Sequence, residues 1–136
     1  MSIINNANIV QLVRNYITNK TALPPDLTNV LIGDWDVSQV TNMERLFLNF
    51  NTFNEPLNGW TVSQVKNMNF MFCRCFVFNQ PLSNWNTSSV IFMCGMFNSC
   101  YNFNQSLNNW NIHNVIDNDY MFTNCSILEK NKPRFK

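Results

Sequence analysis

Three cysteines recur at a 25-residue spacing, and they are the residues of this chain with the most obvious chemistry: Cys75, Cys100 and Cys125. A row of thiols could bind a soft metal ion or form a redox-active stack. However, Cys73 and Cys75 form C-x-C rather than the C-x-x-C typical of zinc sites, and no histidine lies near that pair. Free cysteine is among the most buried residue types, so we interpret the three thiols as small buried hydrophobes. Five cysteines, an odd number, favour a reducing compartment over a disulfide framework, and a redox role is left open.

The other ionisable residues form no recognisable catalytic motif. His113 is the only histidine and could act as a general base, but no nucleophile and carboxylate occupy partner positions. We interpret it instead as a replacement for the serine that caps a helix in the other repeats. Two acidic pairs could suggest a cation site, but neither lies in a calcium-binding loop motif: Asp34 with Asp36, and Asp117 with Asp119. We therefore expect no enzymatic activity, no metal site and no bound cofactor.

Composition narrows the partners of the chain. Charged residues make up 12% of 136 residues and the net charge is +1, which argues against a nucleic-acid-binding surface. No run approaches the roughly 20 apolar residues that span a bilayer, and the first 20 residues lack the features of a signal peptide. We therefore expect an intracellular protein without a membrane span, whose partner is another, unidentified protein or a further copy of itself.

A repeat of 25 residues must position all of these side chains. Four tryptophans stand 25 residues apart, and many other positions keep the same period. A unit of 20 to 50 residues cannot bury its apolar face alone, so successive units stack and share one core. The clearest columns are Trp35, Trp60, Trp85, Trp110; Val40, Val65, Val90, Val115; Phe47, Phe72, Phe97, Phe122; and Phe53, Phe78, Phe103, Leu128.

Each unit is expected to contain one short helix. In the first unit, Val40, Met43, Phe47 and Phe50 lie three or four residues apart, which predicts a helix over 40–50. Serine precedes this stretch in three units and can accept from the free amides of the first helical turn. These predicted caps are Ser38, Ser63 and Ser88.

The rest of each unit is expected to be extended. Leu57 to Val62 is too short for a second helix and predicts a short strand or extended segment that pairs in parallel with its copies. Asn54, Asn79 and Asn104 form a column at the preceding turn, which we interpret as a structural ladder. Buried amides there would satisfy backbone groups of adjacent coils. The alternative is a ladder that contacts a ligand.

The two ends of the chain differ from the repeats. Residues 5 to about 19 are apolar at helical spacing, which predicts an amphipathic helix capping the stack. At the other end, charged residues replace the apolar column, which predicts that a short stack ends there. The expected fold is an α/β repeat solenoid, leucine-rich-repeat-like, with about 3.5 coils in one domain. Its expected divisions are 1–34 (capping helix and lead-in), 35–59, 60–84, 85–109 and 110–128 (repeats), and 129–136 (basic tail).

One unit resembles a known family closely. Residues 78–90 read Phe-Asn-Gln-Pro-Leu-Ser-Asn-Trp-Asn-Thr-Ser-Ser-Val, and Met93-x-x-Met96-Phe97-x-x-Cys100 follows. This pattern resembles the 25- or 26-residue repeat of BspA-like leucine-rich-repeat surface proteins over about residues 35–128. The resemblance implies a leucine-rich-repeat-like solenoid with helices on one side. It also implies a role as an adhesion or protein-binding surface, and localisation at a cell surface or in a virion.

Candidate binding residues lie in the columns that do not repeat. Phe76 and Tyr101 place two aromatics on adjacent coils, and Phe70 and Tyr120 share another variable column. Contiguous exposed aromatics mark interaction sites, although Phe76 and Tyr101 could instead cover the edge of the core. We expect a non-enzymatic protein–protein interaction module that uses the surface of the stack. The alternative is a self-associating structural or assembly component.

Overall fold

The computed structural model describes residues 2–135, so Met1 and Lys136, the ends of the predicted N-terminal and tail segments, lie outside the described residues. Within that range the chain forms one α-helix, α1 (Ile9–Thr18). It also forms three short 3-10 helices: η1 (Lys20–Ala22), η2 (Ile32–Asp34) and η3 (Glu129–Asn131). None of the described helices is long and apolar enough to cross a membrane.

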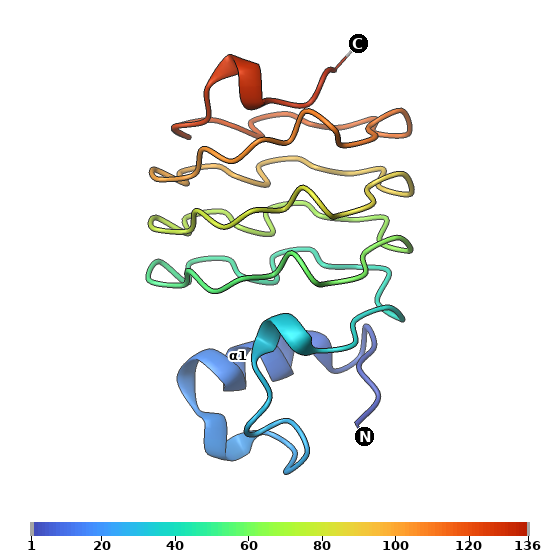
Figure 1. The fold of residues 1–136 in the computed structure, drawn as a ribbon, viewed down its shortest axis with the longest axis vertical. Coiled ribbons are helices and arrows are strands. Elements are labelled where there is room, and N and C mark those ends of the chain that lie inside the picture. The colour runs from blue at the N-terminus through green and yellow to red at the C-terminus, as the bar shows by residue number, and fades with distance from the viewer. Residues whose placement is uncertain (1, 136) are drawn as a thin grey trace.

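Helix α1 occupies the centre of the stretch for which the sequence predicts a helix. Ile9, Leu12, Val13 and Tyr16 are buried along one face, as their three- and four-residue spacing requires. The helix ends at Asn19, whose backbone leaves the helical region. Figure 1 shows α1 lying across the N-terminal end of the repeats, where the Tyr16 ring meets the edge of Trp35 at 5.5 Å. The apolar face of α1 therefore packs on the first repeat.

The repeats wind into successive coils that lie on one another (Figure 1). Along one side, each coil donates four backbone N–H groups to carbonyls of the next. The four bonds between the first two coils measure 2.8–3.0 Å and join Met43 to Asn67, Arg45 to Asn69, Phe47 to Met71, and Asn49 to Cys73. The same four bonds recur between the second and third coils and between the third and fourth. This ladder holds the coils in a 25-residue register.

The prediction of a helix over 40–50 is wrong. The N–H groups of Leu46, Leu48 and Phe50 bond to carbonyls three residues earlier, while those between them bond to the next coil. No amide remains for the i to i−4 bonds of an α-helix. Arg45 and Asn49 have positive φ angles of 58° and 66°, as the third residue of a type II turn requires. The stretch is a run of consecutive turns. Such a run also places residues three and four apart on the same side of the coil.

The prediction of parallel strands is also wrong. The predicted α/β leucine-rich-repeat-like solenoid is therefore wrong as well. Among residues 2–135 the only strand-type pairings between coils are isolated parallel bridges: Asn42 to Asn67, Asn67 to Phe92, and Phe92 to Asp117. A strand needs consecutive extended residues, whereas here a turn bond closes every few residues. Residues 57–62 are likewise closed by the turn bond from the Trp60 amide to the Leu57 carbonyl at 3.0 Å. The repeats are therefore built from turns rather than from helices and strands.

The core between the sides of each coil contains columns of stacked aromatic rings. Phe72 is fully buried and stacks on Phe47 and Phe97 of the adjacent coils at 5.3 and 5.5 Å. It also lies 4.4 Å from Phe78 of its own coil. Stacks of this kind continue through the molecule, so each ring packs against its copies above and below. The 25-residue columns of the sequence are thus the columns of the core.

Two polar columns connect the coils. Trp60, Trp85 and Trp110 each donate the indole N–H to a carbonyl of the preceding coil at 2.7–3.0 Å. Trp35 is buried without such an acceptor among the described residues, because no coil precedes it. In the asparagine column, the Asn54 and Asn79 side chains accept from the backbone N–H of the next asparagine at 2.9 and 3.0 Å. The asparagine column therefore provides acceptors for backbone N–H groups of adjacent coils, as expected. Its asparagines are exposed, however, rather than buried.

Candidate functional site

The aromatic candidates lie on or beside the side of the stack that carries the backbone ladder. Two columns on this side have positive φ angles: Arg45, Phe70, Gly95 and Tyr120 in one, and Asn49, Arg74, Ser99 and Asn124 in the other. Left-handed backbone is unfavourable for bulky residues, costing about 1–2 kcal/mol each. In the two middle coils, ladder bonds to both neighbouring coils hold Phe70, Arg74, Gly95 and Ser99 in place. Their side chains therefore project from a rigid backbone.

Phe76 and Tyr101 form one contiguous aromatic surface, as the sequence predicts. Their rings are stacked with centroids 5.0 Å apart and planes 21° from parallel. Phe76 is half-buried, whereas Tyr101 is 51% exposed, so the outer ring protects the inner one and remains accessible itself. Neither ring stacks with the core phenylalanines, which pair among themselves.

A guanidinium group and two amides border this aromatic pair. Asn49, Asn51, Arg74 and Phe76 line a shallow hollow of about 310 Å³. Arg74 is exposed, and the only ion pair among residues 2–135 joins Lys132 to Glu129 at 2.5 Å. The Arg74 guanidinium is therefore free to bind an acceptor at the edge of the hollow. We call Arg74, Phe76 and Tyr101, together with Asn49 and Asn51, the aromatic face.

Phe70 has a different environment. Its ring lies under the Arg45 guanidinium, whose carbon is 5.5 Å from the ring centroid. On its other side it packs against Gly95 of the next coil, where an added Cβ would lie 2.4 Å from two ring atoms. Glycine at this position therefore makes room for the ring. Phe70 is half-buried between two coils and is better described as packed than as free to bind.

Tyr120 stands apart from the other three candidates. It is 69% exposed on the last coil and has no aromatic neighbour among the described residues. The structure thus brings Phe76 and Tyr101 together but places Phe70 and Tyr120 in separate surroundings.

Sequence reasoning missed the two arginines of this side, Arg45 and Arg74. Both stand at left-handed positions, which no hydrophobic period reveals. The one available signal was the residue types of those two columns, because Gly95, Asn49 and Asn124 are types that tolerate positive φ. Reading these columns as turn positions would have placed the side chains of Arg45 and Arg74 outside the core, where both are exposed.

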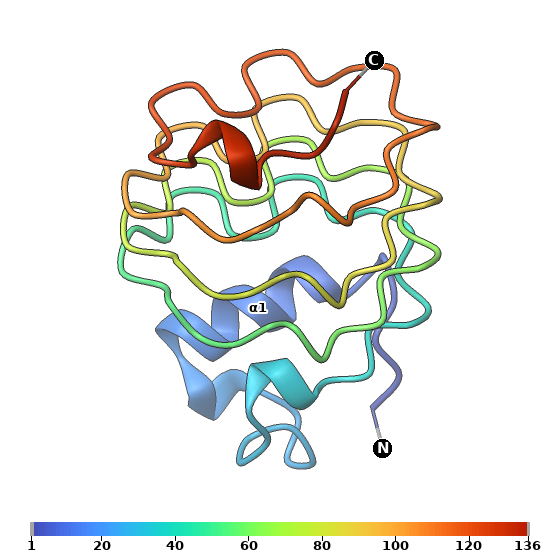
Figure 2. The ribbon, with the colours of Figure 1, turned by 45° about the horizontal axis from the view of Figure 1, so that its top comes forward.

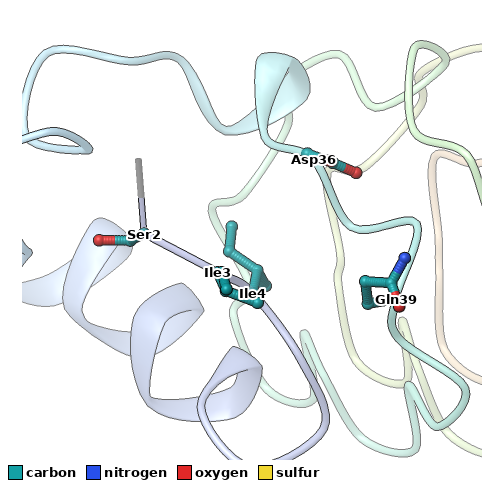
Figure 3. A pocket seen from close by; sticks show the side chains of 5 residues that line it. All are labelled: Ser2, Ile3, Ile4, Asp36 and Gln39. Carbon is teal, nitrogen blue, oxygen red and sulfur yellow. The ribbon is translucent and has the colours of Figure 1, made fainter.

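A second hollow, of about 390 Å³, lies between the N-terminal segment and the first coil. Figure 3 shows Ser2, Ile3 and Ile4 on the N-terminal segment beside Asp36 and Gln39 of the first coil, with the Ser2 side chain pointing away from Asp36. Two of its polar side chains already have partners. Ser2 donates to Asp26, and the Asp36 carboxylate accepts from the Ser38 hydroxyl at 2.6 Å. This site is therefore a weaker candidate than the aromatic face.

Comparison with known proteins identifies the family. The sequence from residue 14 to residue 135 matches the family described as "Mycoplasma protein of unknown function, DUF285". The chain belongs to the DUF285 family. No curated protein and no solved structure matches it. The resemblance to BspA-like leucine-rich-repeat proteins is therefore corrected: the shown family is DUF285, and the repeats lack the helices that the resemblance implies.

The cysteine column of this DUF285 chain lies mostly inside its core. Cys75 and Cys100 are fully buried and donate to the carbonyls of Phe47 and Phe72 in the preceding coils, at 3.1 and 3.0 Å. Burial raises the pKa of both thiols well above the usual range. Cys125 is half-buried, and burial raises the pKa of its thiol as well. All five cysteines are free thiols. Buried protonated thiols are poor nucleophiles, which fits the interpretation of Cys75 and Cys100 as small hydrophobes.

The buried thiols predict a loss of stability at alkaline pH. In the unfolded chain Cys75 and Cys100 ionise near the ordinary thiol pKa of about 8.5. In the folded chain their raised pKa keeps them protonated, so the unfolded state loses protons first as the pH rises. The contribution of the protonated thiols to the free energy of unfolding is therefore complete below pH ~8.5. Above that pH it falls by up to about 1.4 kcal/mol per pH unit for each thiol. Denaturant unfolding at pH 8, 9 and 10 measures this slope, and a Cys75→Ala/Cys100→Ala variant should have a distinctly flatter one. Equal slopes would show that other groups cause the loss.

His113 and the serines predicted as helix caps lie in turns. The His113 backbone N–H donates to the Asn111 side chain at 3.1 Å, so the predicted helix cap is wrong because no helix follows. Ser38 and Ser88 have the same arrangement: their N–H groups donate to Asp36 and Asn86. Within residues 2–135, no group of three or more His, Cys, Asp or Glu side chains is placed to hold a metal ion.

Proposed function

We propose that this DUF285 chain is a non-enzymatic protein-binding module that uses the aromatic face. The observation that carries the proposal is the stacked pair of Phe76 and Tyr101, with an exposed outer ring, beside the free Arg74 guanidinium. Tyrosine, phenylalanine and arginine are enriched at protein interfaces because they offer large rigid contact area and directional hydrogen bonds. The partner is expected to bring an apolar side chain over Tyr101 and an acceptor to Arg74.

The rigid backbone behind the face supports the same proposal. Arg74 donates its backbone N–H to the Asn98 carbonyl at 2.8 Å, and the Cys75 amide bonds to the Phe72 carbonyl at 3.0 Å. Side chains on a fixed backbone lose less conformational entropy on binding than those on a mobile loop. A small face can therefore give specific binding, although two aromatics and one arginine cover less area than a standard interface.

The test is a Phe76→Ala/Tyr101→Ala variant. We expect it to lose at least about 2 kcal/mol of binding free energy, roughly a thirtyfold weaker affinity, because both changed residues are proposed contacts. The tagged wild-type chain is used to isolate its partner from the source lysate, and the purified partner is then titrated against each variant. The melting temperature of the variant should stay close to that of the wild type.

A matched control changes two apolar residues that are more exposed than Phe76 and Tyr101 and lie in the N-terminal part of the chain. Ile3→Ala/Leu31→Ala serves this purpose, since the two side chains are 72% and 64% exposed. It should leave the affinity unchanged. Full binding by the aromatic-face variant would refute the proposed site. A large fall in its melting temperature would show that Phe76 and Tyr101 are part of the core. A mass that rises with concentration, with no other protein bound, would favour the self-associating alternative.

A further inference from the structure

The four columns of the backbone ladder run in one direction, whereas a fifth column beside them, in which Ile91 donates to Lys66 and Ile116 to Ile91, runs the opposite way. The peptide group between Asn67 and Met68 accepts from Met43 through its carbonyl and donates to the Phe92 carbonyl through its N–H. The next two peptide groups in this column extend the same line of hydrogen bonds, since the Met93 amide donates to the Asp117 carbonyl at 2.8 Å. All four columns of the ladder run this way, so the peptide dipoles add along the stack, as they do in a helix. Donors therefore face the C-terminal end of the stack and acceptors face the N-terminal end.

The last coil leaves this row of donors unpaired. By the register of the three preceding ladders, the free groups are the N–H of Asn118, Tyr120, Phe122 and Asn124. None of these four has an acceptor within residues 2–135, whereas the amides between them close turns or bond to a side chain. The Ile116 carbonyl is open beside them; its counterpart in the third coil, Ile91, accepts from Ile116 at 2.9 Å. An exposed row of unpaired backbone donors is a template for pairing with the backbone of another polypeptide.

The apolar columns of the last coil are also incompletely covered. Val90, Phe97 and Cys100 of the third coil are fully buried, but their counterparts Val115, Phe122 and Cys125 are only partly buried. Beside the row of donors, Ile116 and Tyr120 are 77% and 69% exposed. The last coil thus presents unpaired amides and exposed apolar surface together.

The C-terminal segment covers a different part of this end. It bonds to the asparagine-column side, where the Leu107 amide donates to the Asn131 carbonyl at 2.7 Å and the Asn131 side chain bonds to Asn104. The Lys132 ammonium lies 5.5 Å from the Phe122 ring centroid, and the Phe135 side chain packs partly buried against the core. In Figure 2 the dark red segment with η3 crosses the middle of the end, and the orange-red back of the last coil is uncovered.

We propose that the ladder edge of residues 116–124 is a second docking site, which binds a segment of another polypeptide that adopts the turn conformation of a further coil. The donors define the occupant, which must present one N–H followed by four carbonyls on alternate residues. Residues 91–98 make this same pattern toward the second coil, through the Ile91 amide and the carbonyls of 92, 94, 96 and 98. The site is distinct from the aromatic face and does not depend on its function.

A second copy of this chain does not fit the edge. Two C-terminal ends placed face to face would oppose donors to donors, which form no hydrogen bonds. The acceptor end of a second copy is covered by α1 and the segment before it, where the Asn6 side chain bonds to Thr41. The occupant is therefore not a second copy of this chain, and it carries apolar side chains to lie over Ile116 and Tyr120.

The experiment supplies the edge with a ligand of the required pattern. The full chain is extended at its C-terminus by a Gly/Ser linker of about 20 residues and a copy of residues 88–101 with both cysteines replaced by alanine; tethering gives an effective concentration near millimolar. Amide hydrogen exchange is read by NMR at residues 118, 120, 122 and 124. We expect exchange there to slow at least about tenfold relative to the unextended chain. A scrambled copy on the same linker should have no effect.

Two substitutions locate the contact. Ile116→Lys/Tyr120→Lys in the extended chain should abolish the protection, because charges on an edge oppose pairing with another backbone. Val10→Lys on α1, where the side chain is 48% exposed at the other end of the stack, should leave it intact. Unchanged exchange in the extended chain would overturn the proposal. So would slow exchange of the four amides in the unextended chain, since the row would then not be free.

Discussion

Phe72→Ala should destabilise the protein by about 3–5 kcal/mol, which is a large part of the 5–15 kcal/mol that stabilises a typical domain. The ring is fully buried and is surrounded by aromatic rings on its own coil and on both neighbours: Phe47, Phe78, Trp85 and Phe97 at 4.4–6.1 Å. Alanine would leave a cavity that these rings cannot fill, because the backbone ladder fixes the spacing of the coils. Equilibrium unfolding in denaturant, followed by circular dichroism, measures the loss.

Phe76→Ala is the matched control, since it removes the same side chain four residues away in the same coil. Phe76 is half-buried and touches Tyr101 rather than the core stack, so we expect a loss of only about 1 kcal/mol. Phe72→Leu should fall between the two because leucine fills part of the cavity. Similar losses for Phe72→Ala and Phe76→Ala would mean that the aromatic stack does not dominate the core.

Deletion of residues 2–20 should abolish the soluble monomer. It removes the buried side chains Ile9, Leu12, Val13 and Tyr16, each of which contributes about 1.5–3 kcal/mol by leaving water. It also uncovers Trp35 and the first coil, whose apolar surface would then associate between molecules. Light scattering after gel filtration should detect aggregates, and the melting transition should be lost or broadened.

Neighbouring substitutions on α1 give a finer comparison. Ile9 is completely buried and Val10 is 48% exposed, so Ile9→Asp should reproduce much of the deletion phenotype while Val10→Asp should be tolerated. A deletion variant that stays monomeric and melts cooperatively would show that the first coil is stable without α1.

The sequence by itself determined the 25-residue period and the membership of the core columns. Trp85, Phe72 and Cys100 were assigned to buried columns from their spacing, and the structure buries all three. A column repeats only where each coil must present the same side chain to its neighbours, so the period and the core follow from the same residues. The sequence also indicated α1 and the contact between Phe76 and Tyr101, because both depend on residues close in the chain or one period apart.

Only the tertiary structure decided the local conformation of the repeats. The spacing of Met43, Phe47 and Phe50 fits a helix, but consecutive turns place the same residues on one side. The choice between them depends on where the backbone amides find acceptors, and in this protein half of them find acceptors in the next coil, 24 residues away. The hydrophobic period of the sequence does not indicate such a distant hydrogen-bond partner.

The outward side chains and the open edge belong to the same class of information. Arg74 and Phe70 project from left-handed turn positions that the predicted helix would have concealed. The single direction of the ladder is a property of how whole coils are oriented, so no residue type signals it. Side-chain burial is a property of each column and is written in the sequence, whereas hydrogen-bond direction is a property of the assembled backbone and emerges only when the coils stack.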